Sequence, residues 1–376
     1  MSTLDEQLSR LSPAFLELLE RHKFDRARFN RLAARVRSGA TASNRVSGQV
    51  TPPGPGDVTA LPEPGSREYQ ELEQRGLELL KSGKCALVVL AGGMATRMGG
   101  VVKALVEALP GKTFLDLRLA EMDAVERRAG IRAPLWLMTS HATEAKTREA
   151  LGDRLDGEGV ATFSQHLSVR LTPDGDLFLD ESGAPSEHAP GHGDLPDALR
   201  ESGLLARFVQ RGGQLVAMAN LDNLGATLDA AILGWHAKHD SPVTCEVVDK
   251  VGSDRGGIPV RLDDRPVVLE EFRLPESFDP STVRVFNTNT FVFDAQALLD
   301  LDMQFTWFTV SKKVAGKSAL QFERLVGEVT SHLDTKFLRV PRTGALSRFL
   351  PVKDQEELRS RQAELTAVCR NRGMLS

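Results

Sequence analysis

Apolar runs of strand length alternate with helical segments from residue 84 to about residue 300, and this alternation is the strongest constraint on the fold. The runs "CALVVLA" (85–91), "APLWLMTS" (133–140) and "GQLVAMANLD" (213–222) are each followed by a segment with helical character. A repeated strand–helix order predicts an α/β fold with a mostly parallel sheet and helices on both faces. Because ligands bind at the carboxyl ends of parallel strands, the residues after each run are the candidate site residues.

Other parts of the chain have a different pattern. From residue 244 to about residue 293, "TCEVVDKVG", "GGIPVRLDDRPVVLEEF" and "VRVFNTNTFVFD" are typical of antiparallel strands, which we expect to form an elaboration over the open edge of the sheet. Residues 1–83 are expected to form a helical N-terminal arm that contains a Pro/Gly-rich linker, 40–65. A main domain (84–358) and a C-terminal helix (359–376) complete the predicted division.

Composition excludes several classes of protein. The chain has 376 residues and a formal net charge of −4, so no excess of basic residues indicates a nucleic-acid partner. No apolar run approaches the roughly 20 residues that cross a bilayer, and the N-terminus lacks a secretory pattern. Three widely spaced cysteines predict neither a disulfide framework nor a cysteine zinc site. We therefore expect a cytoplasmic protein without a membrane or nucleic-acid partner.

A glycine-rich turn, "LAGGMATRMGG" (90–100), follows the first apolar run. Glycines let main-chain N–H groups approach a ligand closely, and Arg97 and Lys103 carry the positive charge that suits a polyphosphate. The turn matches neither the dinucleotide-binding pattern G-x-G-x-x-G nor the P-loop. On its own, the stretch is interpreted more simply as a strand-to-helix turn with surface cations.

The stretch "NLDN" (220–223) places Asp222 just after a predicted strand. An aspartate at a strand end is a usual ligand of Mg²⁺ bound to nucleotide phosphates. Capping of a following helix that starts near Gly225, by Asp222 or Asn223, explains the stretch equally well.

Two pairs of closely spaced histidines stand out among the eight histidines of the chain. "HAPGHGD" (188–194) holds His188 and His192 near Asp194, but its proline and glycines exclude the helical spacing of a metal site. A tight loop that offers main-chain groups and one imidazole to a ligand is the better interpretation. His236 and His239 lie on an expected helix and are interpreted as surface residues.

Amides and one lysine complete the candidates. Asn287 and Asn289 in "FNTNT" lie on the same side of an expected strand, where amides suit sugar hydroxyls, and Glu270 is a further acceptor. Decoration of an edge strand is the alternative. Lys353 in "RFLPVK" is a compact point charge of the kind that binds a phosphate, but this short stretch is otherwise uninformative.

Taken in order, these stretches resemble the eukaryotic-type UTP–glucose-1-phosphate uridylyltransferases, or UDP-glucose pyrophosphorylases. The resemblance runs from about Ala86 to Leu358, and its most specific stretch is "PGHGDLPDALRESGLLARFVQRGGQLVAMANLDNLGATLD" (190–229). It implies a Rossmann-like, GT-A-like nucleotidyltransferase sheet with an antiparallel sugar-binding elaboration, and it makes 84–358 the catalytic domain. The implied reaction forms UDP-glucose and pyrophosphate from UTP and glucose 1-phosphate by Mg²⁺-assisted in-line attack.

The resemblance also implies roles for individual residues. Arg97, Lys103 and Lys353 would stabilise the reacting phosphates, and Asp222 would bind Mg²⁺. The implied nucleotide-binding residues are Leu90, Ala91, Gly92, Gly93, Gln165, Gly191, Asn220 and Asp222. The implied sugar-phosphate residues are His192, Glu270, Asn287, Asn289 and Lys250.

Departures from the family pattern leave alternatives open. Ala95 and Val102 replace a glycine and a proline of the usual loop. The C-terminal β-helix domain of relatives is expected to be lacking, so the resemblance carries over no oligomeric state and a monomer stays open. A UDP-N-acetylglucosamine or broad-specificity UDP-sugar pyrophosphorylase is the alternative activity. A non-catalytic sugar-nucleotide-binding protein is the alternative of another class.

Overall fold

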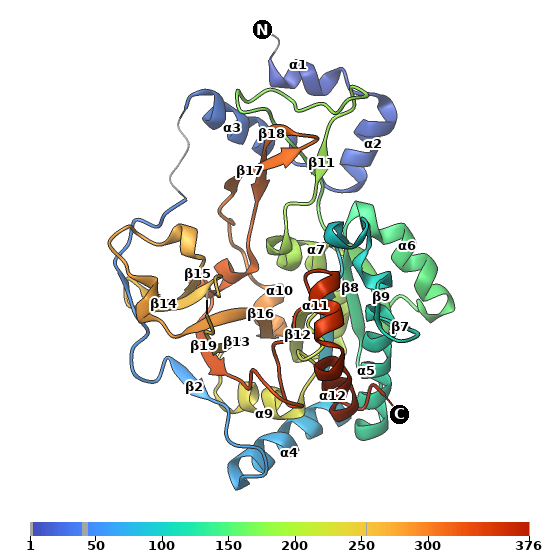
Figure 1. Cartoon of the computed structure of the whole chain (residues 1–376), viewed down its shortest axis with the longest axis vertical. Helices are drawn as coiled ribbons and strands as arrows, with labels where there is room; N and C mark the ends of the chain where they lie inside the picture. The colour runs from blue at the N-terminus through green and yellow to red at the C-terminus, as the bar shows by residue number, and fades with distance from the viewer. Residues whose placement is uncertain (1–2, 40–43, 253, 376) are drawn as a thin grey trace.

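A central eight-stranded sheet organises the computed structural model, which describes residues 3–39, 44–252 and 254–375 (Figure 1). Its strands are β2 (Val58–Ala60), β3 (Cys85–Leu90), β8 (Leu135–Thr139), β9 (Val160–Ser164), β12 (Leu215–Asn220), β13 (Val243–Asp249), β16 (Val285–Asp294) and β19 (Thr335–Arg339). They lie in the order β2-β19-β13-β16-β12-β3-β8-β9. Only β16 runs antiparallel to its neighbours, so the predicted mostly parallel α/β fold is confirmed.

Helices cover both faces of this sheet. Trp136 of β8 packs edge-on against Phe208 of α8 (Leu204–Gln210), with ring centroids 5.4 Å apart. Leu87 and Ala217 are in register with the residue that precedes Trp136 in β8. Because successive side chains of a strand point to opposite faces, Leu87 and Ala217 point to the face opposite that of Trp136. There they line a small void together with Ile232 of α9 (Ala230–Lys238). Helices α8 and α9 therefore lie on opposite faces.

A second helix, α4 (Arg67–Lys81), packs closely on α9. A Cβ atom on Gly76 would lie 1.8 Å from the carbonyl oxygen of Ala230, and one on Gly234 would lie 1.9 Å from that of Leu72. Such distances are impossible for real atoms, so the two helices approach this closely only because both crossing positions are glycine. The contact encloses α9 between the sheet and α4.

Some strands lie elsewhere than expected. β13 and β16, from the first and third of the runs expected over the open edge, are interior strands of the main sheet. Only the middle run forms a separate unit, in which β14 (Ile258–Leu262) pairs with both β15 (Arg265–Leu269) and β1 (Val50–Thr51). Strand periodicity identifies a strand but not its partner, which is the reason for the difference.

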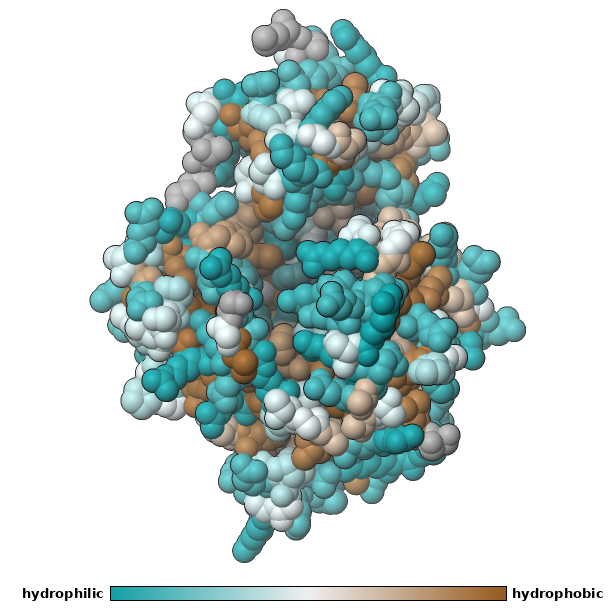
Figure 2. All heavy atoms as spheres, viewed as in Figure 1, coloured by the Kyte–Doolittle hydropathy of each residue, from teal (hydrophilic) through white to brown (hydrophobic). Residues whose placement is uncertain are grey.

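The N-terminal helical unit, residues 4–37, lies at one end of the molecule (Figure 1). It consists of α1 (Leu4–Ser9), α2 (Pro13–Arg21) and α3 (Arg26–Arg37). Its core, including Leu8 and Phe29, packs against Leu171 and Phe322 as a second hydrophobic cluster. Phe322 belongs to β18 (Lys317–Glu323), which pairs with β17 (Phe308–Val314). The space-filling view is hollowed between this end and the main body (Figure 2).

The first 83 residues are thus distributed over two places, because α4 belongs to the main core. Residues 1–2, 40–43 of the expected linker, 253 and 376 lie outside the described residues, and the division into three parts stays a prediction.

No helix in the described ranges is long and apolar enough to cross a bilayer. The remaining helices are α5 (Phe114–Ala129), α6 (His141–Leu151), α7 (Leu195–Glu201), α10 (Ala295–Leu299), α11 (Gln355–Ser360) and α12 (Gln362–Asn371). Short strand pairs are β4 (Met94–Ala95) with β5 (Val101–Val102), β6 (Glu107–Leu109) with β7 (Lys112–Thr113), and β10 (Ser168–Val169) with β11 (Glu187–His188).

The expected surface position of His236 is wrong. The side chain is buried in α9, and its Nδ1 lies 2.8 Å from Oγ1 of Thr244. His239, half-buried, stacks on Trp235 at a centroid distance of 3.9 Å. The physical reason is that this face of α9 packs against β13, which carries Thr244 and which a single-helix interpretation does not take into account. Burial lowers the pKa of His236 to about 4.

We expect the free energy of unfolding to decrease as the pH falls from about 6.5 towards 4, because unfolded histidines bind protons that the buried ones do not. Each such histidine contributes about 1.4 kcal/mol per pH unit in this window. The check is urea unfolding of the wild type and His236→Gln at about pH 7.5 and about pH 5. The variant should lose about 2 kcal/mol less than the wild type between these conditions. Equal losses would contradict the assigned pKa.

Candidate active site

A cavity of about 340 Å³ lies at the carboxyl ends of β3, β8 and β12. Open α/β sheets bind their ligands at this edge. Ala91 is buried next to the cavity and donates its N–H to the Met138 carbonyl at 2.8 Å. The lining residues are Leu90, Gly92, Gly93, Lys103, Met138, Gln165, Ala189, Gly191, His192, Asn220, Leu221 and Asp222. The structure therefore brings together most of the residues implied for nucleotide binding.

Close approach favours glycine at two positions around the cavity. A Cβ on Gly92 would lie 2.1 Å from Nε2 of Gln165, so the glycine lets this amide cross the turn. A Cβ on Gly193 would lie 2.4 Å from the carbonyl carbon of Arg324, which is backbone and cannot move aside easily. Around Gly93 the space for a Cβ is open, so its main chain is accessible from the cavity.

Lys103 and Asp222 meet in the cavity. The Lys103 Nζ donates to Oδ2 of Asp222 at 2.6 Å. The side chain of Lys103 is 20% exposed to solvent and that of Asp222 is 15% exposed. The two residues come from different elements, since Lys103 follows β5 and Asp222 follows β12. The ion pair thus joins the glycine-rich turn to the end of a central strand.

The helix-cap interpretation of Asp222 and Asn223 is wrong. The next helix, α9, starts at Ala230, and Asp229 is its N-cap, accepting from the N–H groups of Ala231 and Ile232. Asn223 is buried and bonds to the chain that follows β19, donating to the Arg348 carbonyl at 3.0 Å. Asp222 is therefore left for a role in the cavity.

The two asparagines of "FNTNT" have different positions. Asn289 donates from Nδ2 to Oδ1 of Asn220 at 2.9 Å, so it reaches the rim of the cavity. It has a left-handed backbone with φ of 56°, and its N–H donates to Oδ1 of Asn287 at 2.8 Å. The same oxygen accepts from the buried thiol of Cys245 at 3.3 Å. Asn287 therefore supports Asn289 and does not line the cavity.

His192 offers one donor to the cavity. The N–H of Val326 donates to its Nδ1 at 3.1 Å, and burial lowers the pKa of the imidazole to about 4. The ring is therefore neutral at physiological pH with its proton on Nε2. Within the part of the chain that the structure describes, no three His, Cys, Asp or Glu side chains gather as a metal-binding group. Asp194 instead pairs with the guanidinium of Arg324.

Besides Asn287, four further implied residues lie outside the cavity, and their roles stay predictions. Arg97 is exposed on the turn Thr96–Met98, and the Lys250 Nζ donates to the Pro280 carbonyl at 3.2 Å. Glu270 is half-buried, and burial raises the pKa of its carboxyl. Lys353 is exposed in the segment before α11, which begins at Gln355.

Arg118 of α5 is a site-supporting residue that sequence reasoning missed. It is fully buried, and Nη2 donates to the carbonyls of Asn220 at 2.7 Å and Asn223 at 2.8 Å. Nη1 donates to the Ala226 carbonyl at 3.0 Å and to Glu121 at 2.7 Å. These bonds satisfy backbone carbonyls of the irregular, buried segment that carries Asp222. An arginine inside the apolar run "FLDLRLAEM" was the available signal.

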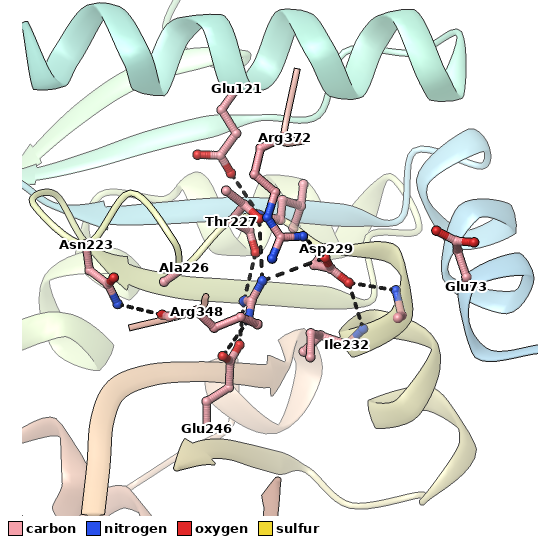
Figure 3. A network of polar contacts seen from close by, with 12 residues as sticks. Glu73, Glu121, Asn223, Ala226, Thr227, Asp229, Ile232, Glu246, Arg348 and Arg372 are labelled. Carbon is pink, nitrogen blue, oxygen red and sulfur yellow. Dashed lines mark hydrogen bonds and ion pairs between the residues drawn. The ribbon is translucent and has the colours of Figure 1, made fainter. Parts of the chain in front are cut away.

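A second buried arginine, Arg348, holds the far end of the same segment. Figure 3 shows its guanidinium between Glu246 and Asp229. It bonds both carboxylate oxygens of Glu246 at 2.6 Å and the Thr227 carbonyl at 3.1 Å. Bidentate pairs of this kind fix orientation as well as distance. The segment from β12 to α9 is thus tied down at both ends.

We expect Arg118→Met to destabilise the protein by about 3–5 kcal/mol, because Glu121 and three carbonyls would lose a buried partner. Arg128→Met is the matched control on the same helix, since its ion pair with Glu73 is exposed. The control should lose less than about 1 kcal/mol. Urea unfolding measures both, and similar losses in the two variants would contradict the role given to Arg118.

Comparison with known proteins identifies the family of the chain. The family model described as UTP–glucose-1-phosphate uridylyltransferase matches residues 27–374. A relative of that name from Astragalus penduliflorus is 29% identical over 388 residues, covering 98% of this chain and 79% of the relative. UTP–glucose-1-phosphate uridylyltransferase 2 from Dictyostelium discoideum is 32% identical over 307 residues, covering 76% of this chain and 59% of the relative.

Solved structures show the same fold. A UDP-N-acetylglucosamine pyrophosphorylase from Trypanosoma brucei superposes with a TM-score of 0.74 at 18% identity, covering 97% of this chain and 84% of that one. A mutant UDP-glucose pyrophosphorylase from Leishmania major, in complex with UDP-glucose, has a TM-score of 0.71 at 23% identity, with 93% and 78% covered. With the cavity at the strand ends and the match across residues 27–374, the chain belongs to the UTP–glucose-1-phosphate uridylyltransferase family.

Proposed function

We propose that the chain forms UDP-glucose and pyrophosphate from UTP and glucose 1-phosphate. The observation that carries the proposal is the Lys103–Asp222 pair in a cavity that glycine main chain also lines. A cation, a carboxylate and accessible main-chain N–H groups are what a nucleoside triphosphate with its metal requires. The names of the relatives support UTP and glucose 1-phosphate as the substrates.

Uracil is proposed to bind between the turn that starts at Leu90 and the residues Gln165 and Gly191. The Oε1 atom of Gln165 is buried without a hydrogen-bond partner among the described residues. A buried acceptor in this state favours a ligand that donates an N–H, as the imide edge of uracil does. The open space around Gly93 leaves room for the ring or ribose against the main chain.

Asp222 is proposed to hold Mg²⁺. Mg²⁺ is typically bound through one or two carboxylates, with phosphate oxygens and waters as its other ligands, and a single carboxylate in a phosphate site fits that pattern. The Lys103 ammonium lies 2.6 Å from the Asp222 carboxylate, so this carboxylate already has a positive charge beside it. The bound ion would neutralise negative charge between the phosphates. Asn220, beside this carboxylate, is assigned to the ribose and phosphates.

The reaction needs orientation and charge rather than a covalent nucleophile. A phosphate oxygen of glucose 1-phosphate forms a bond to the α-phosphorus of UTP, while the bond from this phosphorus to pyrophosphate breaks. Lys103 is assigned to the triphosphate from its position in the cavity. Arg97, Lys250 and Lys353 lie outside it, so their proposed phosphate contacts require the segments that carry them to move towards the bound substrates.

Glucose is proposed to bind at the side of the cavity formed by His192 and Asn289. The Nε2–H of His192 is a donor, and the Asn289 amide next to Asn220 offers both a donor and an acceptor to hydroxyls. Glu270 is a further proposed acceptor. An N-acetylglucosamine or broad-specificity enzyme is the alternative, and a non-catalytic sugar-nucleotide binder is the alternative of another class.

We expect pyrophosphate release with UTP, Mg²⁺ and glucose 1-phosphate, at a higher kcat/KM than with galactose 1-phosphate or N-acetylglucosamine 1-phosphate. The measurement is a coupled pyrophosphate assay across this panel. A preference for N-acetylglucosamine 1-phosphate would replace the proposed substrate. Binding of UDP-sugars without turnover of any sugar phosphate would support the non-catalytic alternative.

We expect Lys103→Met and Asp222→Asn each to lower kcat/KM by on the order of 10²- to 10³-fold, because each removes charge that faces the phosphates. Lys112→Met is the matched control, since this lysine is exposed on β7 of a nearby hairpin. It should change kcat/KM by less than about twofold, as expected of a surface charge. Losses below about tenfold for the cavity variants would show that the pair is not part of the reaction.

A further inference from the structure

We infer that the N-terminal helical unit (residues 4–37) positions the base-binding wall of the cavity, acting through His22, Arg28, Trp307 and Arg324. The inference rests on the proposed function for the identity of the base, but the contacts that carry it belong to the protein alone. None of these four residues lines the cavity, so they are positioning residues. The sequence itself suggests no role for this part of the chain.

His22, just after α2, holds the chain on both sides of Gln165. Its carbonyl accepts from the N–H of Leu167 at 2.9 Å, and its Nδ1 lies 3.2 Å from the Oγ of Ser164. Gln165 lies between these two attachments and carries the buried, unpartnered Oε1 of the proposed base site. The position of the Gln165 side-chain amide therefore depends on His22 at the end of α2.

Helix α3 lies directly behind the same wall. Arg28 and Phe29 line a small pocket together with His166, Ser168 and Pro190. His166 follows Gln165 and Pro190 precedes Gly191, so the helix packs against the immediate neighbours of two cavity residues. The packing involves side chains of an otherwise separate hydrophobic cluster.

Trp307 connects α3 to a buried arginine. The Arg28 guanidinium carbon lies 4.4 Å from the centroid of the Trp307 ring, and that of Arg324 lies 5.0 Å from it. Cation–π contacts of this kind are strongest on tryptophan and gain when desolvated. Arg324 is almost completely buried, so its orientation is set by protein groups rather than by solvent.

Arg324 in turn holds the loop that carries Gly191 and His192. Its side chain pairs with Asp194, bonds Asp197 at 2.7 Å and lies 3.0 Å from Nδ1 of His166. The Arg324 carbonyl accepts a hydrogen bond from the N–H of Gly193 at 3.0 Å, and the Arg324 N–H donates to the Pro190 carbonyl at 2.8 Å. Two residues further, Val326 donates to His192. A continuous set of contacts thus runs from α3 to the cavity.

The test is UTP binding by titration calorimetry with Arg28→Ala, measured without a sugar phosphate. We expect the Kd for UTP to rise about 5- to 20-fold, and Arg28→Lys to restore part of the affinity. Arg26→Ala is the matched control, because Arg26 lies on the same helix but bonds Asp5 and Ser9 of α1. The control should stay within about twofold, the range of an exposed ion pair.

A second measurement, hydrogen exchange in the free protein, separates this inference from the proposed function. The backbone amides of residues 165–167 and 190–194 should exchange faster in Arg28→Ala than in the wild type. In Arg26→Ala their exchange rates should equal those of the wild type. Wild-type exchange in both variants would overturn the inference, as would an equal change in both. If the wild type does not bind UTP, the proposed base site fails, and the exchange result still decides the positioning role.

Discussion

A buried segment without regular structure, from Leu221 to Asp229, is the constraint on which the site depends. Backbone groups that are removed from water must find partners inside the protein. A helix or strand would supply these partners itself, whereas the carbonyls of Asn223, Ala226 and Thr227 in this segment accept from Arg118 or Arg348. The arginines in turn need buried carboxylates, which Glu121 and Glu246 provide. Asp222 can therefore face the cavity at the end of β12 without serving as a helix cap.

The opposite wall of the cavity is held by the same kind of contact. Arg324 fixes the loop of Gly191 and His192 through Asp194 and through its own backbone. Buried charges are stabilising only when each is paired and hydrogen-bonded, so such clusters allow few alternative geometries. Between the two walls, Gly92 and Gly93 leave the main chain open. The protein thus combines firmly held walls with a cavity that side chains do not fill.

How much the sequence could predict follows from what each pattern encodes. Strand runs followed by glycine, asparagine and aspartate predict ligand residues at the strand ends, and the cavity gathers Gly92, Asn220 and Asp222 there. Periodicity does not encode partners, so the interior positions of β13 and β16 could not be predicted. The burial of His236 depends on its contact with Thr244 of β13, and the role of Arg118 depends on carbonyls more than 100 residues away. An arginine inside an apolar run indicates that it has a buried partner, but the local sequence does not indicate which residues that partner comes from.

A crystal structure with UTP and Mg²⁺ would show whether the Lys103–Asp222 cavity is the nucleotide site. We expect the uracil ring to lie beside Gln165, with Oε1 of this residue accepting from the base. We also expect Lys103 to contact phosphate oxygens and Asp222 to bind the metal. Nucleotide density outside this cavity, or phosphates bound away from both Lys103 and Asp222, would contradict the assignment of the site.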